Sequence, residues 1–387
     1  MRDPQLVARR VVVSGHDPAR AASEIARVCG APAPQLVIVF ATWRCDPIAL
    51  AKALVRALPE SRIIGCTTSG EIATGGDHED TVVALSLASP SLRVGVGVAP
   101  ELSRHVLRSS KAAVEAAAAE LGVSPDALEL RRHVAITMID PRSRVQESFC
   151  LGVAATASRI HFVGGAASDG HADPEVTRVF CDGQVHADAA VVAILETTLP
   201  FAVLQIEHMI PTEIRTVVTG ADPDRRLILE LDGHPAATRY RALIARVGGP
   251  ATVDDQVVAS YPFATYIGGE PYVRSVMRIE GDALAMATAF DPGAVLRLMR
   301  AGDLVGTTDR AFTSASHEVG EAGAVIGFSC VARHIEATAR GCRAELAHIY
   351  DRVPMIGFHS LGEQAGPLMG NHTLTGLVIG TGERHGG

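Results

Sequence analysis

The sequence is poor in aromatic residues, in paired cysteines and in long apolar runs. Phe, Tyr and Trp make up 4% of the 387 residues, so the cores must be built from aliphatic side chains. No apolar run approaches the roughly 20 residues of a membrane-spanning helix, and the run after Arg10 is too short for a secretory signal. The seven scattered cysteines form no Cys-x-x-Cys pair, which favours reduced thiols in a cytoplasmic protein without membrane insertion.

Basic residues are also too few for a nucleic-acid-binding protein. The 35 Lys and Arg are outnumbered by 43 Asp and Glu, giving a formal charge of −8. This balance argues against a nucleic-acid partner, whose phosphates require a basic surface. The Walker, dinucleotide-binding and zinc-protease motifs are missing, and no histidines have a metal-binding spacing. We therefore expect a protein that is not an enzyme.

A glycine-bounded turn occurs three times. Each copy follows a short apolar run, and another apolar run begins about 30 residues upstream, with a helical pattern between them. This length suits a βαβ crossover. The sequence thus predicts an α/β (mixed α+β) fold of repeated strand–helix–strand units with mixed, largely buried sheets. The three copies are residues 65–71 (GCTTSGE), 164–170 (GGAASDG) and 357–363 (GFHSLGE).

The length of the chain favours two domains over one. The character of the sequence changes between Pro200 and Pro211. We therefore place the domain boundary there, between residues 1–210 and residues 211–387. In the second half, Gly268-Gly269-Glu270 resembles a degenerate fourth copy of the turn, and residues 293–301 have a helical pattern.

The repeated units predict a binding site at one edge of the sheets. In right-handed crossovers, the strand-to-helix loop and the glycine turn lie at the same edge, where open α/β sheets bind ligands. Arginines bind carboxylates and acids bind ammonium groups, so the site suits a zwitterion such as an amino acid. Each loop carries an arginine, at Arg44, Arg142 and Arg333. The turns carry Thr67, Thr68, Ser69, Glu71, Ser168, Asp169, Ser360 and Glu363.

These residues also have a purely structural interpretation. The glycines would permit tight turns, the hydroxyls would cap them, and the arginines would pair with the acids. Under the binding hypothesis, replacing Arg44 or Arg333 with alanine should abolish ligand binding and hardly change the thermal midpoint, because exposed charges contribute little to folding. A large loss of stability with unchanged binding would favour the structural interpretation.

Several stretches resemble the FIST family (F-box and intracellular signal transduction). They are residues 37–42 (VIVFAT), 64–72 (IGCTTSGEI) and 357–363 (GFHSLGE), and the resemblance covers roughly residues 35–380 with its motifs in the family's order. It implies FIST N- and C-terminal domains and a sensory module that binds small ligands, usually suggested to be amino acids. No F-box or output domain is recognisable, so the chain would act as a stand-alone sensor that regulates a partner signalling protein.

Other stretches resemble a bacterial branch of FIST haemoproteins that sense nitric oxide. These are residues 208–219, 272–276, 362–364 and 371–373, with departures at the last and at 328–330. The resemblance implies haem b with His208 on the iron, and a histidine kinase or a cyclic-di-GMP enzyme as partner. Arg274 and Arg333 are then candidates to hold the porphyrin propionates. Under the structural alternative, His208 is a strand-end histidine bonded to backbone.

Two other classes of function stay open at this point. Cys66, at a strand-to-turn corner, would serve as the nucleophile of an enzyme, although buried free cysteines are usually inert. A protein-interaction scaffold without a ligand is the third class. A homodimer is compatible with each of the three.

Overall fold

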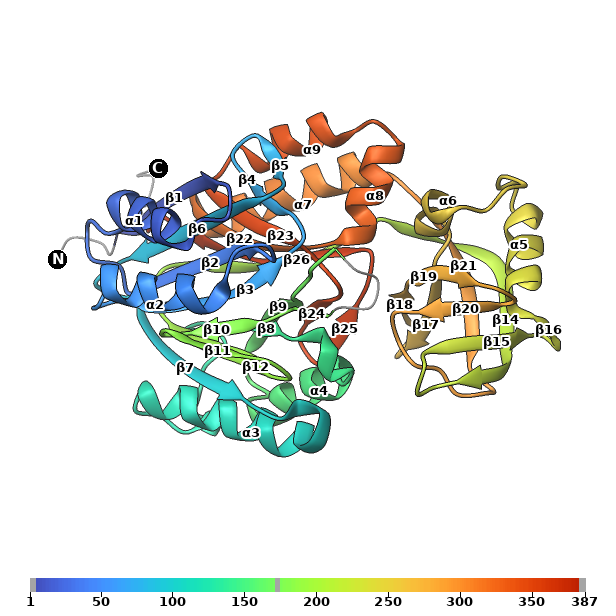
Figure 1. Ribbon diagram of the computed structural model, residues 1–387, viewed down its shortest axis with the longest axis horizontal. Helices are drawn as coiled ribbons and strands as arrows, with labels where there is room; N and C mark the ends of the chain where they lie inside the picture. The colour runs from blue at the N-terminus through green and yellow to red at the C-terminus, as the bar shows by residue number, and fades with distance from the viewer. Residues whose placement is uncertain (1–4, 171–174, 383–387) are drawn as a thin grey trace.

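Three units of the same topology surround one shared core, and a separate sheet is inserted into the third unit. The computed structural model describes residues 5–170 and 175–382 (Figure 1). Its helices and its mixed sheets confirm the predicted mixed α+β class. In these two ranges, no helix has both the length and the apolar character needed to cross a membrane.

The first two units follow each other along the chain. The first consists of β1 (Val7–Ser14), α1 (Pro18–Cys29), β2 (Leu36–Thr42), α2 (Pro47–Ala57), β3 (Arg62–Thr68), β4 (Glu71–Ala73), β5 (Gly76–His78) and β6 (Thr81–Ala88). The second consists of β7 (Arg93–Ala99), α3 (Leu102–Glu120), β8 (His133–Ile139), α4 (Gln146–Thr156), β9 (His161–Ala166), β10 (Val179–Cys181), β11 (Gln184–His186) and β12 (Ala190–Glu196), with 3-10 turns at Pro125–Ala127 and Pro141–Ser143.

The third unit is interrupted after its first strand. It consists of β13 (Phe201–Glu207), α7 (Leu304–Val319), β22 (Ala322–Cys330), α8 (Val331–Ala339), α9 (Arg343–Tyr350), β23 (Met355–Ser360), β24 (Glu363–Ala365), β25 (Leu368–Gly370) and β26 (Thr373–Gly380). The inserted part consists of β14 (Met209–Asp222), β15 (Leu227–Leu231), β16 (His234–Pro235), α5 (Ala236–Arg246), α6 (Asp255–Ser260), β17 (Phe263–Ile267), β18 (Glu270–Arg274), β19 (Val276–Glu280), β20 (Ala283–Met286) and β21 (Val295–Ala301).

Local sequence explains where the crossover helices begin. In the first unit, Asp46 accepts hydrogen bonds from the backbone N–H groups of Ile48 and Ala49, and Pro47 occupies the first helical position. Such a cap and such a proline both favour a helix start. The β2 strand before this helix is buried at every residue, which is typical of a strand covered on both faces.

Each unit completes its sheet with a hairpin from another unit. The units' own strands pair in the equivalent orders β1-β6-β2-β3, β7-β12-β8-β9 and β13-β26-β22-β23. The hairpin β10–β11 of the second unit then pairs with β3, the hairpin β24–β25 of the third with β9, and the hairpin β4–β5 of the first with β23. This exchange is cyclic, so the three units depend on one another.

The shared core lies between the three sheets. Side chains from β2, β8 and β22 and from their parallel neighbours form one buried cluster, while the helices pack on other faces of the sheets. Phe40 has its ring centroid 4.7 Å from that of Phe358 and 6.1 Å from that of Phe328. Three phenylalanines therefore pack together where the first and third units meet.

The inserted part forms its own sheet and its own apolar cluster, which lies to one side of the three units (Figure 1). The predicted fourth copy of the turn is wrong, because β17 and β18 form an antiparallel hairpin in this sheet. The predicted helix over 293–301 is also wrong. Leu296 and Leu298 are fully buried on one face of β21, which pairs with β14 and β17. The predicted domain boundary at residue 210 falls near the start of β14. The division of the chain into two domains at this residue stays a prediction.

Candidate functional site

The three glycine turns meet at one place. The Ser69 backbone N–H and hydroxyl donate to Ser168 Oγ at 2.9 and 3.0 Å, and the Ser168 hydroxyl donates to the carbonyl of His359 at 2.7 Å. The Leu361 N–H in turn donates to the carbonyl of Ala166 at 3.2 Å. The predicted repeat therefore brings its three turns together as expected.

A cleft of about 800 Å³ opens between these turns and the inserted sheet. One wall contains Ser69, Gly170 and Leu361 from the three turns, with the start of α8. The opposite wall comes from α6, β19, β20 and the turn before β15. The cleft has a size typical of small-molecule sites. A ligand in this cleft would contact both the body formed by the three units and the inserted part.

Arginine dominates the charge of the cleft. Glu280 is the acidic residue in its described lining, and its carboxylate pairs with Arg225 at 3.4 Å and with Arg278 at 3.0 Å. One carboxylate is thus shared by two guanidinium groups. The chain as a whole is acidic, so this excess of positive charge is local. The arginines that line the cleft are Arg142, Arg144, Arg225, Arg226 and Arg278.

Two of these arginines are positioned in different ways. The Arg226 guanidinium donates to the carbonyl of Arg144 at 2.9 Å and to Gln146 Oε1 at 3.0 Å, and its burial lowers its pKa. Arg142 follows β8, where its N–H donates to Asp140 Oδ1 at 3.1 Å. The Arg142 side chain is exposed and makes no hydrogen bond or ion pair within residues 5–170 and 175–382. It is the guanidinium best placed to bind an incoming anion.

The predicted acids of the turns are directed into the protein. Glu363 is 1% exposed and accepts hydrogen bonds from Ser360 Oγ at 2.6 Å and Thr373 Oγ1 at 2.8 Å. The equivalent carboxylate in the first unit, Glu71, is held by the hydroxyls of Thr68 and Thr81. These side chains close their own turns and do not line the cleft, which agrees with the structural interpretation.

Burial raises the pKa of Glu363 to about 8 and that of Glu71 to about 7. A carboxyl group with a raised pKa binds its proton more tightly in the folded protein. The protonated carboxyl group therefore stabilises the folded state at low pH, and this contribution to the free energy of unfolding is lost as the pH rises through the pKa of the folded state.

We expect Glu363→Gln to remove this dependence. Between about pH 5 and 8, the free energy of unfolding of the natural protein should fall relative to the variant by up to about 1.4 kcal/mol per pH unit. Urea unfolding at four pH values measures this difference. The exposed Glu115 provides the control variant Glu115→Gln. Parallel curves for all three proteins would show that Glu363 is ionised throughout.

Most of the other predicted binding residues also lie away from the cleft. Ser69 and Arg142 line it, whereas Arg44 forms an ion pair with Asp80 and stacks on Trp43. The hydroxyl of Thr67 accepts from the Arg178 N–H, and Asp169 accepts from the N–H groups of residues 175 and 176. Arg274 donates to the carbonyl of Met369 and so joins the inserted part to the body.

Arg333 and His208 belong to one buried network. The guanidinium of Arg333 donates to His208 Nδ1 at 3.2 Å and to Thr308 Oγ1 at 2.8 Å, and His208 Nε2 lies 2.7 Å from the Glu336 carboxylate. Because arginine can only donate, His208 accepts at Nδ1 and donates from Nε2. Burial lowers the pKa of His208, which favours this neutral form. The expectation that Arg333 is an exposed charge is wrong, since it is 1% exposed.

The residues predicted to hold haem do not fit that group in this arrangement. The His208 side chain is 0% exposed, both its ring nitrogens have protein partners, and it does not line the cleft. Arg274 and Arg333 are engaged in the bonds described above, so neither is available to a propionate. Cys66 likewise offers no reactive thiol, because it is fully buried and burial raises its pKa well above the usual value.

The fold and site together define a three-unit α+β protein with an arginine-rich cleft between its body and an inserted sheet. The sequence profile of the FIST N domain matches residues 35–234, and that of the FIST C domain matches residues 236–366. These matches span most of the chain, and the protein belongs to the FIST family. FIST domains are associated with sensing in signal transduction.

Comparisons with individual proteins add little to the family assignment. No curated protein matches the chain. Among solved structures, cyanuric acid hydrolase from A. caulinodans is 13% identical over 97% of this chain and 100% of its own, with a TM-score of 0.33. T. maritima PurL complexed with ATP is 9% identical over 99% of this chain and 73% of its own, with a TM-score of 0.21. Likenesses at this level carry no functional argument.

Proposed function

We propose that this FIST protein is a sensor that binds a small carboxylate, such as an amino acid, in the cleft between the turns and the inserted sheet. The observation that carries the proposal is the cluster of five arginines against Glu280 in an 800 Å³ cleft. Guanidinium groups bind carboxylates bidentately, and partial burial strengthens such bonds. Apolar lining from Leu227, Val276 and Ile335 suits a ligand with an aliphatic body.

The position of the cleft also suggests how binding is transmitted. Its two walls belong to parts with separate apolar clusters, which are joined by contacts such as the Arg144 bond to the carbonyl of Asp224 at 3.1 Å. A ligand that bridges the two walls favours one placement of the inserted part over others. A signalling partner, such as a histidine kinase or a cyclic-di-GMP enzyme, would respond to that placement. Haem binding stays a prediction of sequence resemblance, and the absence of enzyme activity stays a prediction from the missing catalytic motifs.

Calorimetric titration with L-amino acids and their α-carboxamides tests the proposed ligand class. The two sets share side chains and ammonium groups, but only the acids carry an α-carboxylate. We expect at least one amino acid to bind about 10–100-fold more tightly than its amide, since hydrogen bonds to charged groups contribute about 1.5–3 kcal/mol. Added salt should weaken that binding. Equal affinities for acid and amide, or no binding by any member of the panel, would contradict the proposal.

A further inference from the structure

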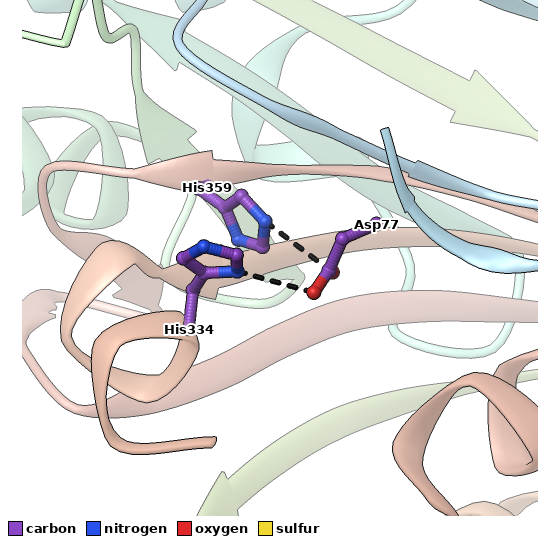
Figure 2. Close-up of side chains that lie close together, drawn as sticks. All are labelled: Asp77, His334 and His359. Atoms are coloured by element: carbon purple, nitrogen blue, oxygen red, sulfur yellow. Dashed lines mark hydrogen bonds and ion pairs between the residues drawn. The ribbon is translucent and has the colours of Figure 1, made fainter. Parts of the chain in front are cut away.

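Three side chains that could share a metal ion converge where the hairpin β4–β5 meets the third unit. Asp77 comes from β5, His334 from α8 and His359 from β23 (Figure 2). Asp77 Oδ2 lies 3.1 Å from His334 Nδ1, and Asp77 Oδ1 lies 3.3 Å from His359 Nε2. The donor atoms of all three residues lie within 4.8 Å of one another. Figure 2 shows both imidazole rings directed toward the carboxylate.

These separations suit a common metal ion. Bonds from a first-row ion to imidazole nitrogen or carboxylate oxygen are about 2.0–2.2 Å long. Two ligands at tetrahedral or octahedral angles are then about 3.0–3.5 Å apart. The two contacts of Asp77, each made by a different carboxylate oxygen, fall in that range. Two histidines and one carboxylate are a recurring ligand set for zinc and non-haem iron, and they leave positions open for water or another ligand.

His359 is the member whose surroundings most need explaining. It is 6% exposed, and neither ring nitrogen makes a hydrogen bond of acceptable geometry with any described residue. Its 3.3 Å approach to Asp77 is close enough for an ion pair but is poorly directed for a hydrogen bond. Buried polar atoms without such a partner destabilise a protein.

The repeated architecture shows that the fold does not require these donors. The same junction of hairpin and parallel strand occurs three times, with the register fixed by backbone pairing. At the position of His359, the other two junctions have Thr67 and Ala166. At the position of Asp77, they have Val185 and Met369. Two junctions form without a carboxylate or an imidazole there, so the cluster at the third is an addition to the common fold.

From these observations we propose that Asp77, His334 and His359 bind a divalent first-row transition ion, with Zn²⁺ as the probe ion. Arg343 Nε, 3.0 Å from Asp77 Oδ2, would orient the carboxylate, as outer hydrogen-bond partners do at metal sites. His334 lies in the same helix as Ala332 and Ile335, which line the cleft. The metal ion would link the β4–β5 hairpin of the first unit to α8. The metal site would be separate from the proposed carboxylate site.

Titration of the full, chelator-treated chain with Zn²⁺ tests the proposal. We expect one bound ion per chain by calorimetry, a rise in the thermal midpoint, and visible absorption when Co²⁺ replaces Zn²⁺. His334→Ala and Asp77→Asn should each weaken Zn²⁺ binding by at least about 10-fold, because a lost ligand costs no less than a lost outer partner. His348→Ala, which removes an exposed histidine of α9, should bind as the natural chain does.

Folding of the variants can be checked independently of metal binding. The His334 side chain is 21% exposed, so its truncation should preserve the far-UV circular dichroism spectrum. Zn²⁺ binding by His334→Ala and Asp77→Asn that is as tight as that of the natural chain, or no bound ion in the natural chain, would overturn the proposal and leave the cluster as an ion-pair network. Because the amino-acid titrations use a different site, their failure would not affect this result.

Discussion

Replacing Arg333 with alanine is expected to lower the free energy of unfolding by about 3–5 kcal/mol, the usual effect of removing one partner from a buried charged network. The substitution would leave His208 Nδ1 and Thr308 without their donor, and the buried Glu336 with less compensating charge. Chemical denaturation at neutral pH measures the change directly.

Arg44 offers a matched control for that experiment. It lies just after β2 in the first unit, as Arg333 lies just after β22 in the third, but its side chain is 49% exposed and pairs with the half-exposed Asp80. Arg44→Ala should therefore change the free energy of unfolding by at most about 1 kcal/mol. Equal effects of the two substitutions would show that the Arg333 network does not contribute to stability as its burial indicates.

Phe40→Ala should produce a second large effect, of about 3–5 kcal/mol, because it empties a fully buried position in the shared core. The ring contacts those of Phe358 and Phe328, so the change removes packing between the first unit and the third. Since the sheets exchange hairpins cyclically, we expect one cooperative unfolding transition in the variant as in the natural protein.

Leu151→Ala is the control for this substitution, because the leucine is 51% exposed on α4. It should change stability by about 0.5 kcal/mol or less. A loss below about 1 kcal/mol for Phe40→Ala would contradict the description of one core shared by three sheets.

The repeated glycine turns made the three units visible in the sequence, because each turn lies at a fixed distance from a buried strand. The exchange of hairpins was not predictable in the same way. The β4–β5 hairpin pairs with β23, far along the chain, and nothing in its short strands specifies that partner. Residues 295–301 illustrate a different limit, because pairing with β14 and β17 overrides their helical pattern.

The candidate site was predictable only in part, for a related reason. Ser69 and Arg142 lie beside motifs that the repeat identifies, and both line the cleft. Arg225, Arg226 and Arg278 belong to the inserted part, and local sequence does not indicate which face of the body that part covers. Asp77 and His334 are 257 residues apart, so no spacing rule could reveal their contact with His359. The acids of the turns had the right position, but groups of their own units bind them.

The affinity of Arg142→Ala for the tightest-binding amino acid tests directly whether the cleft is a carboxylate site. We expect a Kd about 10–100-fold above that of the natural chain, with an unchanged thermal midpoint in the absence of ligand. Arg56→Ala, which removes an exposed arginine on α2 outside the cleft, should bind as the natural chain does. Unchanged affinity in Arg142→Ala, or an equal loss in Arg56→Ala, would contradict the assignment of the cleft as the carboxylate site.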